Sequence, residues 1–490
     1  MNHQPSSIDH SPVPMTPTIG LEIHCQLKTR SKMFCACSTA FGSPPNTQVC
    51  PVCLGYPGAM PVMNGEAIRL TVRTGLMLGC EIPEVSKFDR KSYFYPDMPK
   101  NYQISQYDQP LCVGGALTFD LEGAPRTVRL RRIHLEEDVA KNVHFAACSG
   151  VDFNRAGVPL MEIVTEADLH SADEAMAFLL ALRQVILYAG VSDANLEEGN
   201  LRCDVNVSVA PAGQRELGVK AEIKNMNTFK GVHAALRCEI ARQIEVLRTG
   251  GRIVQETRRW DPDAGVTESM RTKEDAHDYR YFPEPDLMPV VLAPETVTAW
   301  RASLPEAPAA RRRRLAEEYG LPEYDAGVLT ADRAVADYYE AAARQSPNPK
   351  AVSNWIMTEM LRLLSERQLS LADAKVAPAA LARLVALVDA KTINSNTAKD
   401  VFALLFEQGG DPDAIVKAKG LAQVSDEGAI VDLARQVIAE NARSAADYRA
   451  GKEAALKHLI GQVMRLSRGK ANPQLAAEVL RREMTNPGPV

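Results

Sequence analysis

Short runs in the first 290 residues alternate between apolar and polar side chains, which is typical of a β-strand with one buried face. In the first run, Leu21, Ile23, Cys25 and Leu27 alternate with Glu22, His24, Gln26 and Lys28. Apolar positions also alternate over 205–209 and again over 219–223. The connection between these two runs, residues 211–218, is rich in turn-forming residues and predicts an antiparallel pair.

Helix-like spacing of apolar residues interrupts these strands over about 65–79, 172–189 and 230–249. This order of elements predicts an α+β domain rather than a series of βαβ units. From about residue 305 onward, Ala, Leu, Glu and Arg dominate with helical spacing, which predicts an all-α remainder with a break near Gly409-Gly410. The predicted organisation is a flexible proline-rich leader (1–17), an α+β domain (18–304), a helical domain (305–410) and a helical tail domain (411–490).

The composition narrows the class of protein. Of the 490 residues, 46% are hydrophobic and 24% are charged, which excludes an intrinsically disordered or fibrous protein. The net charge of −5 argues against a general nucleic-acid coat, but residues 449–482 carry eight Lys/Arg against two acids. That segment could attract a polyanion, with a solvated helical face as the alternative. We expect a cytosolic protein without a membrane span, because no long apolar run and no export signal occur.

Four of the ten cysteines lie close together, as Cys35-x-Cys37 and Cys50-x-x-Cys53. Two tight pairs at this spacing can close a tetrahedral zinc site in which no coordination position stays open. The motif therefore predicts a structural zinc that fixes a loop. An iron–sulfur cluster and unmetallated thiols are the alternatives.

Polar side chains with metal-binding chemistry recur on the predicted strands. Glu22 and His24 project from the same face of the first strand, and Glu136 shares a strand face with His134. Glu162 stands alone in an apolar run, and Asp204 alternates with Arg202 and Asn206. Each acid alone could be ordinary sheet surface. Together they predict a site for Mg²⁺ bridging to nucleotide phosphates, although the imidazole leaves Mn²⁺ open.

The positive charge that phosphoryl oxygens require would come from Arg202, Lys220 and Lys224. The sequence contains no Gly-x4-Gly-Lys-Ser/Thr phosphate loop and no Gly-x-Ser-x-Gly motif around a nucleophile. A nucleotide would therefore be held by side chains and metal on the sheet. Any activated serine or cysteine nucleophile would come from a partner.

Read together, these segments resemble the GatB family, the B subunits of tRNA-dependent amidotransferases. The resemblance extends over nearly the whole chain after residue 17. The matching stretches are Ile19-Gly-Leu-Glu-Ile-His24, Tyr56-Pro-Gly58, Ser86-Lys-Phe-Asp-Arg-Lys-Ser-Tyr-Phe-Tyr-Pro-Asp97, Tyr102-Gln-Ile-Ser-Gln106, His134-Leu-Glu-Glu-Asp138, Glu197-Glu-Gly-Asn-Leu-Arg-Cys-Asp-Val-Asn206, Lys224-Asn225, Asp278-Tyr-Arg-Tyr-Phe-Pro-Glu-Pro-Asp286 and Gly469-Lys-Ala-Asn-Pro473.

The resemblance implies a glutamine-synthetase-like cradle domain, a helical domain and a YqeY-like tail that touches tRNA. It implies ATP-dependent phosphorylation of the side-chain carboxylate of Glu-tRNA(Gln) or Asp-tRNA(Asn), followed by amidation with ammonia channelled from the glutaminase subunit GatA in a heterotrimer with GatC. The implied Mg²⁺ ligands fall on Glu22, His24, Glu136 and Glu162. Further catalytic or ATP-binding roles are predicted for Asp204, Arg202, Asn206, Lys220 and Lys224, and tRNA contacts for Lys452, Lys457, Arg465, Arg468 and Lys470.

Two other classes of function fit parts of this pattern. A glutamine-synthetase-like ligase acting on a free amino acid would use similar metal chemistry but would not need a basic tail. A non-catalytic RNA-binding scaffold would leave the acidic cluster as ordinary surface and would consume no ATP. The sequence leaves open which misacylated tRNA is the physiological substrate.

Overall fold

The computed structural model describes residues 14–272, 279–421, 427–467 and 471–485. The chain divides into two compact units, Met1–Ala309 and Ala310–Val490. Within the described ranges, no helix is both long enough and apolar enough to cross a bilayer.

The first unit is built on a nine-stranded sheet. Its strand order is β14-β13-β12-β11-β1-β10-β7-β5, with β6 paired to β7. Among the described strands of this sheet, only the β12–β13 pair is parallel, so the sheet is mixed, as predicted for an α+β domain. The strands are β1 (Met15–Gln26), β5 (Cys112–Val113), β6 (Ala116–Leu121), β7 (Ala124–Glu137), β10 (Pro159–Thr165), β11 (Leu201–Pro211), β12 (Ala221–Lys224), β13 (Glu256–Asp261) and β14 (Val266–Thr272). The predicted antiparallel pairing of the runs around 205–209 and 219–223 is confirmed by β11 and β12.

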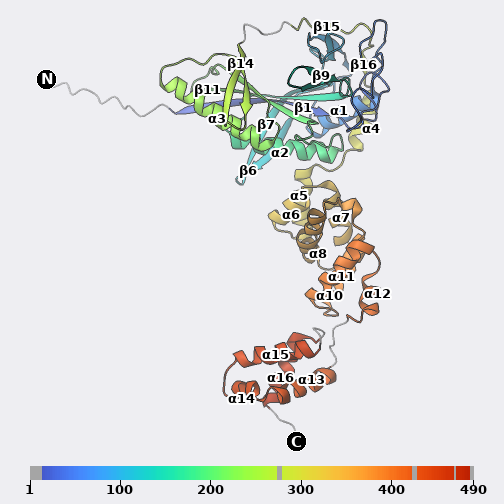
Figure 1. Ribbon diagram of the computed structural model, residues 1–490, viewed down its shortest axis with the longest axis vertical. Helices are drawn as coiled ribbons and strands as arrows, with labels where there is room; N and C mark the ends of the chain where they lie inside the picture. Colours follow the sequence, from blue (N-terminus) through green and yellow to red (C-terminus); the bar gives the residue numbers. More distant parts are fainter. Residues whose placement is uncertain (1–13, 273–278, 422–426, 468–470, 486–490) are drawn as a thin grey trace, which may run out of the picture. The chain divides into compact units, whose positions relative to one another are not determined.

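Three helices pack on the apolar face of this sheet: α1 (Gly65–Met77), α2 (Ala172–Ala189) and α3 (Phe229–Arg248) (Figure 1). Each begins where a polar side chain caps free backbone N–H groups, namely Asn64, Ser171 and Thr228. The three helices confirm the predicted ranges to within a few residues. Because the apolar side chains of β1 face this helical layer, the opposite face of the sheet keeps the polar side chains.

Short strands outside the main sheet complete the first unit. The strands β15, β3 and β4 form a three-stranded sheet, and β16–β2 and β8–β9 are two-stranded pairs. Their bounds are β2 (Val85–Ser86), β3 (Asp89–Ser92), β4 (Tyr102–Ser105), β8 (Lys141–His144), β9 (Ser149–Asp152), β15 (Phe282–Pro283) and β16 (Val290–Val291), and helix α4 covers Pro294–Ala302. The short strand β3 carries Lys91, whose positive charge lowers the pKa of Glu136 on β7.

The described part of the second unit is helical, as predicted, and has two separate apolar cores. The first core is formed by α5 (Pro308–Tyr319), α6 (Glu323–Leu329), α7 (Arg333–Ala343), α8 (Pro349–Trp355), the π-helical turn η2 (Ile356–Met360), α9 (Leu361–Arg367), the 3₁₀ turn η3 (Leu371–Asp373), α10 (Pro378–Asp389), α11 (Ser395–Gln408) and α12 (Pro412–Ala418). The second is formed by α13 (Glu427–Glu440), α14 (Ala442–Arg449), α15 (Ala454–Leu466) and α16 (Pro473–Thr485).

Three expected boundaries differ from the observed elements. Strand β1 begins at Met15, inside the expected leader of residues 1–17, because Met15–Pro17 extend the ladder with β11. The first compact unit runs to Ala309 rather than 304. Helix α12 lies beyond the expected boundary at 410, yet its Val416 is buried in the core of the preceding helices.

Candidate active site

The polar face of the sheet aligns side chains from four adjacent strands. His24 of β1 is the register partner of Glu162 on β10 and of Arg202 on β11, and Glu162 is in turn the partner of His134 on β7. Partners in register lie on the same face of a sheet, so these four residues form one row. Glu136 lies two residues after His134 on β7 and joins the row from the same face.

Three of these residues converge closely enough to hold a metal ion. Ligand atoms of His24, Glu136 and Glu162 all lie within 4.8 Å of one another. The Nε2 atom of His24 is 3.3 Å from Oε2 of Glu162 and 3.7 Å from Oε1 of Glu136. Two carboxylates and an imidazole are a donor set that suits a divalent cation.

A second histidine completes this cluster from the other side. Nε2 of His134 lies 3.4 Å from Oε2 of Glu162 and 3.8 Å from Oε2 of Glu136. Its Nδ1 is buried and has no hydrogen-bond partner among the described residues. Ser105 donates a hydrogen bond of 3.2 Å to Glu136. Although His134 stands in a predicted strand, its role in the cluster was missed, because the sequence does not fix which strand lies beside β10.

The charges of the cluster shift the pKa of each member. Burial disfavours the imidazolium of His134, but the charges of Glu162 and Glu136 outweigh it and raise its pKa to about 9. Burial also opposes the charge of His24, yet its hydrogen bond and ion pair with Glu162 raise its pKa. Burial opposes ionisation of Glu162 as well, but the two imidazoles hold its pKa well below the usual range. Burial likewise opposes ionisation of Glu136, but its hydrogen bond with His134 and the charge of Lys91 lower its pKa. The site therefore favours the ionised form of both carboxylates.

The predicted ligand Glu22 lies outside this close group. It belongs to the next row of the sheet, where its register partners are Val164 and Asp204, and it accepts a hydrogen bond of 3.1 Å from Nδ2 of Asn206. Burial and the neighbouring charges of Glu162, Glu222 and Asp204 raise its pKa. Glu22 therefore places a further carboxyl group beside the cluster and is not among the three closely grouped ligands.

The three basic residues predicted for phosphate binding differ in their partners and in their exposure to solvent. Lys224 is held between two carboxylates, because its Nζ donates to Asp204 and lies 3.0 Å from Glu222. Arg202 donates a hydrogen bond of 2.5 Å from Nη2 to Asp138. Lys220 is exposed and lines a hollow of about 200 Å³ together with Glu22 and Asn206.

Lys91 is a further basic residue that the sequence prediction did not select. Its ammonium group lies 4.8 Å from the ring centroid of Tyr279. Burial works against its charge, but Glu136 and Glu162 raise its pKa well above the usual value. Lys91 lies on a four-residue strand outside the main sheet, so no alternation pattern indicated that it faces the acids.

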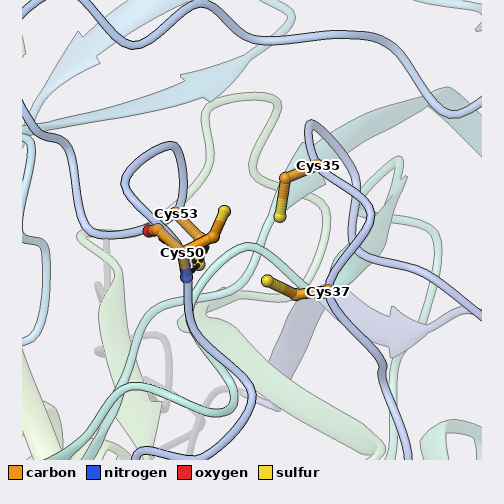
Figure 2. Close-up of side chains that lie close together, drawn as sticks. All are labelled: Cys35, Cys37, Cys50 and Cys53. Carbon is orange, nitrogen blue, oxygen red and sulfur yellow. Dashed lines mark hydrogen bonds between the residues drawn. The ribbon is translucent and has the colours of Figure 1, made fainter.

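The cysteine quartet is assembled as the spacing predicts. Figure 2 shows Cys35 and Cys37 on one loop facing Cys50 and Cys53 on another. One ligand atom from each lies within 4.8 Å of the others, and the sulfurs of Cys50 and Cys53 are 3.9 Å apart. Sulfurs at the corners of a tetrahedral zinc site are about 3.8 Å apart, given Zn–S bonds of about 2.3 Å, so the quartet fits zinc.

Local hydrogen bonds favour a thiolate in this quartet. A hydrogen bond with Cys35 lowers the pKa of Cys53 to about 4 against the effect of burial, and the charge of Lys32 acts in the same direction. Lys32 is fully buried, and its Nζ donates to Sγ of Cys53 at 3.5 Å and to the carbonyl of Phe153 at 3.1 Å. A buried lysine beside the sulfurs would compensate part of the negative charge that four thiolates bring to a zinc ion.

The predicted tRNA contacts are only partly described. Lys457 and Arg465 are exposed on α15, and Lys452 is exposed but paired with Asp447 at 2.9 Å. Arg468 and Lys470 lie outside the described residues.

The fold and the site define a multidomain α+β protein that carries a candidate metal-dependent catalytic cluster on its sheet. A family described as the GatB/GatE catalytic domain matches residues 17–298, and a second, described as the GatB domain, matches residues 337–484. The chain belongs to the GatB/GatE family.

Full-length relatives support this assignment. A protein of Carboxydothermus hydrogenoformans is 52% identical over 468 residues, which cover 94% of this chain and 97% of the relative. Proteins of Caldicellulosiruptor saccharolyticus and Geotalea uraniireducens are 50% and 51% identical over 471 residues, covering 95% of this chain and 98% of each relative. All three are named as the B subunit of an aspartyl/glutamyl-tRNA(Asn/Gln) amidotransferase.

Proposed function

We propose that this chain is the B subunit of a tRNA-dependent amidotransferase, a ligase that amidates the side-chain carboxylate of Glu-tRNA(Gln), Asp-tRNA(Asn) or both. The family membership carries the class of reaction. The observation that carries the catalytic role of this chain is the convergence of His24, Glu136 and Glu162 on one face of the sheet.

The chemistry explains why such a protein needs ATP. A carboxylate reacts poorly with ammonia until one of its oxygens becomes part of a good leaving group. In the first step the substrate carboxylate oxygen forms a bond to the γ-phosphorus of ATP, and the bond from that phosphorus to ADP breaks. Ammonia then attacks the acyl carbon and loses a proton, and inorganic phosphate leaves with the electron pair of the broken C–O bond.

In this proposal, His24, Glu136 and Glu162 hold Mg²⁺, or Mn²⁺ as the alternative, and Glu22 places a further carboxyl group beside them. The ion would offset negative charge on the transferring phosphoryl group and align it with the carboxylate. The chain's own task is positioning: the strand register fixes the three ligands relative to one another before the substrate arrives.

The nucleotide is assigned to the same face. Arg202 is the register partner of His24, Asn206 and Lys220 line a hollow together with Glu22, and Lys224 pairs with Asp204, the register partner of Glu22. Arginine and lysine suit phosphate oxygens because their N–H groups form charge-assisted hydrogen bonds. Asp204 holds Lys224 in place through its ion pair. These contacts support nucleotide binding without a glycine-rich phosphate loop.

The remaining parts receive structural and binding roles. The cysteine quartet binds a structural zinc, and residues 18–304 form a glutamine-synthetase-like catalytic cradle. The tail after residue 410 is a YqeY-like domain. Its tRNA contacts are Lys452, Lys457, Arg465, Arg468 and Lys470. A glutaminase subunit, GatA, and a small subunit, GatC, complete a cytoplasmic heterotrimer in which ammonia is channelled from GatA.

The test is ATP hydrolysis by this chain co-purified with the two partner subunits, with ammonium as the nitrogen donor, in the presence and absence of misacylated Glu-tRNA. We expect hydrolysis that requires the misacylated tRNA and falls by about 100-fold or more in His24→Ala. His170→Ala is the matched control, because His170 is exposed and bonded to Pro17 away from the cluster.

The other outcomes separate the remaining classes of function. Hydrolysis stimulated by a free amino acid instead of the misacylated tRNA would identify a free-acid ligase. No stimulation by either would leave a non-catalytic scaffold. Stimulation by tRNA that survives His24→Ala would keep the reaction but remove His24 from its site.

A further inference from the structure

The carboxylate of Asp138 lies directly after β7 and is one of the most enclosed acids of the cradle. The residue is 2% exposed, and its Oδ2 accepts hydrogen bonds from Nε2 of Gln26 at 2.7 Å and from Nη2 of Arg202 at 2.5 Å. Its Oδ1 accepts a bond of 2.8 Å from the backbone N–H of Val139. Both oxygens are therefore fixed in direction.

Asp138 thereby determines where the guanidinium of Arg202 lies. Arg202 is the register partner of His24, so its Cα lies beside the metal-binding row. Two other acids, Glu136 and Asp204, also attract its charge, but its hydrogen bond goes to Asp138. The Nε of Arg202 is buried and has no hydrogen-bond partner among the described residues. An arginine held by one Nη and left with an unused buried N–H group is prepared to bind a further acceptor.

Gln26 strengthens this arrangement from the strand that carries His24. Because Gln26 lies two residues after His24 on β1, both side chains project from the same face. Its amide holds Asp138 on the side of β1, and Arg155 approaches the same oxygen, Oδ2, at 3.8 Å. Burial opposes ionisation of Asp138, but Arg202 and Arg155 hold its pKa below the usual range, so it stays a carboxylate.

We infer that Asp138 is a positioning residue: together with Gln26 it fixes Arg202 so that the remaining N–H groups of the guanidinium bind the phosphoryl group transferred at the His24–Glu136–Glu162 cluster. This inference rests on the proposed function. Asp138 itself does not touch the reacting atoms. Without it, Arg202 is free to turn toward Glu136 or Asp204, where it would neutralise an acid of the site instead of binding phosphate.

The test is a double-mutant cycle on the complete heterotrimer, with Asp138→Asn, Arg202→Ala and the double variant. The readouts are kcat and the KM values for ATP and for misacylated tRNA in ammonium-dependent amidation. Asp138→Asn alone is expected to lower kcat roughly 10- to 100-fold and to leave the KM for tRNA within about twofold. In the Arg202→Ala background, the same substitution is expected to change kcat by less than about twofold.

A purely structural role for Asp138 makes a different prediction. Asp138→Asn would then lower kcat by the same factor whether or not Arg202 is present, and that result would overturn the inference. The control is Asp168→Asn, because Asp168 also binds an arginine, Arg129 at 2.7 Å, but away from the cluster. A wild-type complex that consumes no ATP in response to misacylated tRNA would overturn the proposed function and this inference with it.

Discussion

Glu239 on α3 shows how a single buried charge stabilises the first compact unit. Its carboxylate is fully enclosed and accepts hydrogen bonds from Arg242 at 2.6 Å, Gln243 at 2.8 Å and Thr267 at 2.8 Å, while Nε of Arg258 lies 3.3 Å away. Burial works against its charge, but these partners lower its pKa below 4.5. The network joins α3 to β13 and β14, at the end of the sheet that follows β12.

We predict that Glu239→Gln lowers the free energy of unfolding by about 3 kcal/mol at pH 7, because two arginines lose their buried counter-charge. A carboxylate with a lowered folded pKa stabilises the protein above its unfolded pKa and loses that effect as pH falls through the folded pKa. The difference between wild type and variant should therefore shrink as pH falls below about 4.5. Urea unfolding at pH 7, 5 and 4 measures it.

The control for this prediction is Glu268→Gln, which removes an exposed ion pair with Arg259 on the neighbouring strand. Such pairs contribute less than about 1 kcal/mol. Equal losses in the two variants, or a difference that does not depend on pH, would contradict the role assigned to Glu239.

At this scale the sequence could predict the residues that alternate on a single strand but not those that meet across strands. The period of two indicated that Glu22 and His24 share a face, and the structure places both there. It could not indicate that Glu162 lies opposite His24 while Glu22 lies opposite Val164, because strand register is set by pairing between distant segments. Asp138 and Lys91 were not selected for the same reason: their partners, Arg202 and Glu136, come from other strands.

At the scale of elements, the loop that carries Cys50 and Cys53 is connected to the turn before β10, the strand that carries Glu162. Asn46 of the loop accepts a hydrogen bond of 2.7 Å from the N–H of Phe153, and Asn154 donates one of 2.7 Å to the carbonyl of Pro44. Lys32 also binds the Phe153 carbonyl. These contacts fix the turn that precedes β10. The zinc proposed for the cysteine quartet would therefore stabilise a segment next to the candidate active site without taking part in the reaction.

We predict that the purified chain carries about one zinc ion and that Cys50→Ser abolishes this binding, because three thiolates cannot close a tetrahedral site. Metal content by mass spectrometry and the thermal midpoint before and after chelation are the measurements. The thermal midpoint should fall by several degrees both in the variant and in the chelated wild type. The reason is that a structural metal binds only the folded chain, so its binding free energy adds to the free energy of folding.

Cys148→Ser is the matched control, because Cys148 is exposed and lies outside the quartet. It should keep the zinc and the wild-type midpoint. Iron in place of zinc would identify an iron–sulfur cluster. A wild-type protein that contains no metal and whose thermal midpoint does not change on chelation would rule out a metal site.

Elements with a strong local pattern were predictable, and those that depend on distant partners were not. Helical spacing of apolar residues indicated α1, α2 and α3, and alternation indicated β1, β11 and β12. The two-residue strands β2, β5, β15 and β16 carry too few residues for any periodicity. They are strands only because a neighbouring segment supplies hydrogen-bond partners.

At the scale of the whole molecule, the part of the chain that the structure describes has three separate apolar cores, so each part can be changed without destabilising the others. Among the described residues, the core of the first unit, the core of α5–α12 and the core of α13–α16 share no buried residue, so substitutions on the surface of one need not disturb another. The change of sequence texture near residue 305 predicted the first division, because a sheet and helical bundles need different hydrophobic periods. The sequence could not predict that α12 belongs to the core of the preceding helices, because this depends on the burial of Val416 against them.

The tail should bind tRNA through charge. Lys457 and Arg465 are exposed on α15 and project from one helix, so their reversal to Glu removes two potential phosphate-binding groups without touching a core. We predict that Lys457→Glu/Arg465→Glu weakens binding of misacylated tRNA by about tenfold or more at low salt. The dependence of log K on log salt should become shallower by about 0.7 to 0.9 for each phosphate that is no longer neutralised.

The matched control is Lys230→Glu/Arg237→Glu, an equal change of charge on the exposed side of α3 in the first unit. Filter binding of tRNA over a salt series and amidation kinetics at saturating tRNA distinguish the outcomes. A local interaction predicts a raised KM for tRNA, an unchanged kcat and a shallower salt slope in the tail variant alone. Equal weakening in both variants would mean that only net charge matters, and a fall in kcat at saturating tRNA would place these residues in the chemistry instead of in binding.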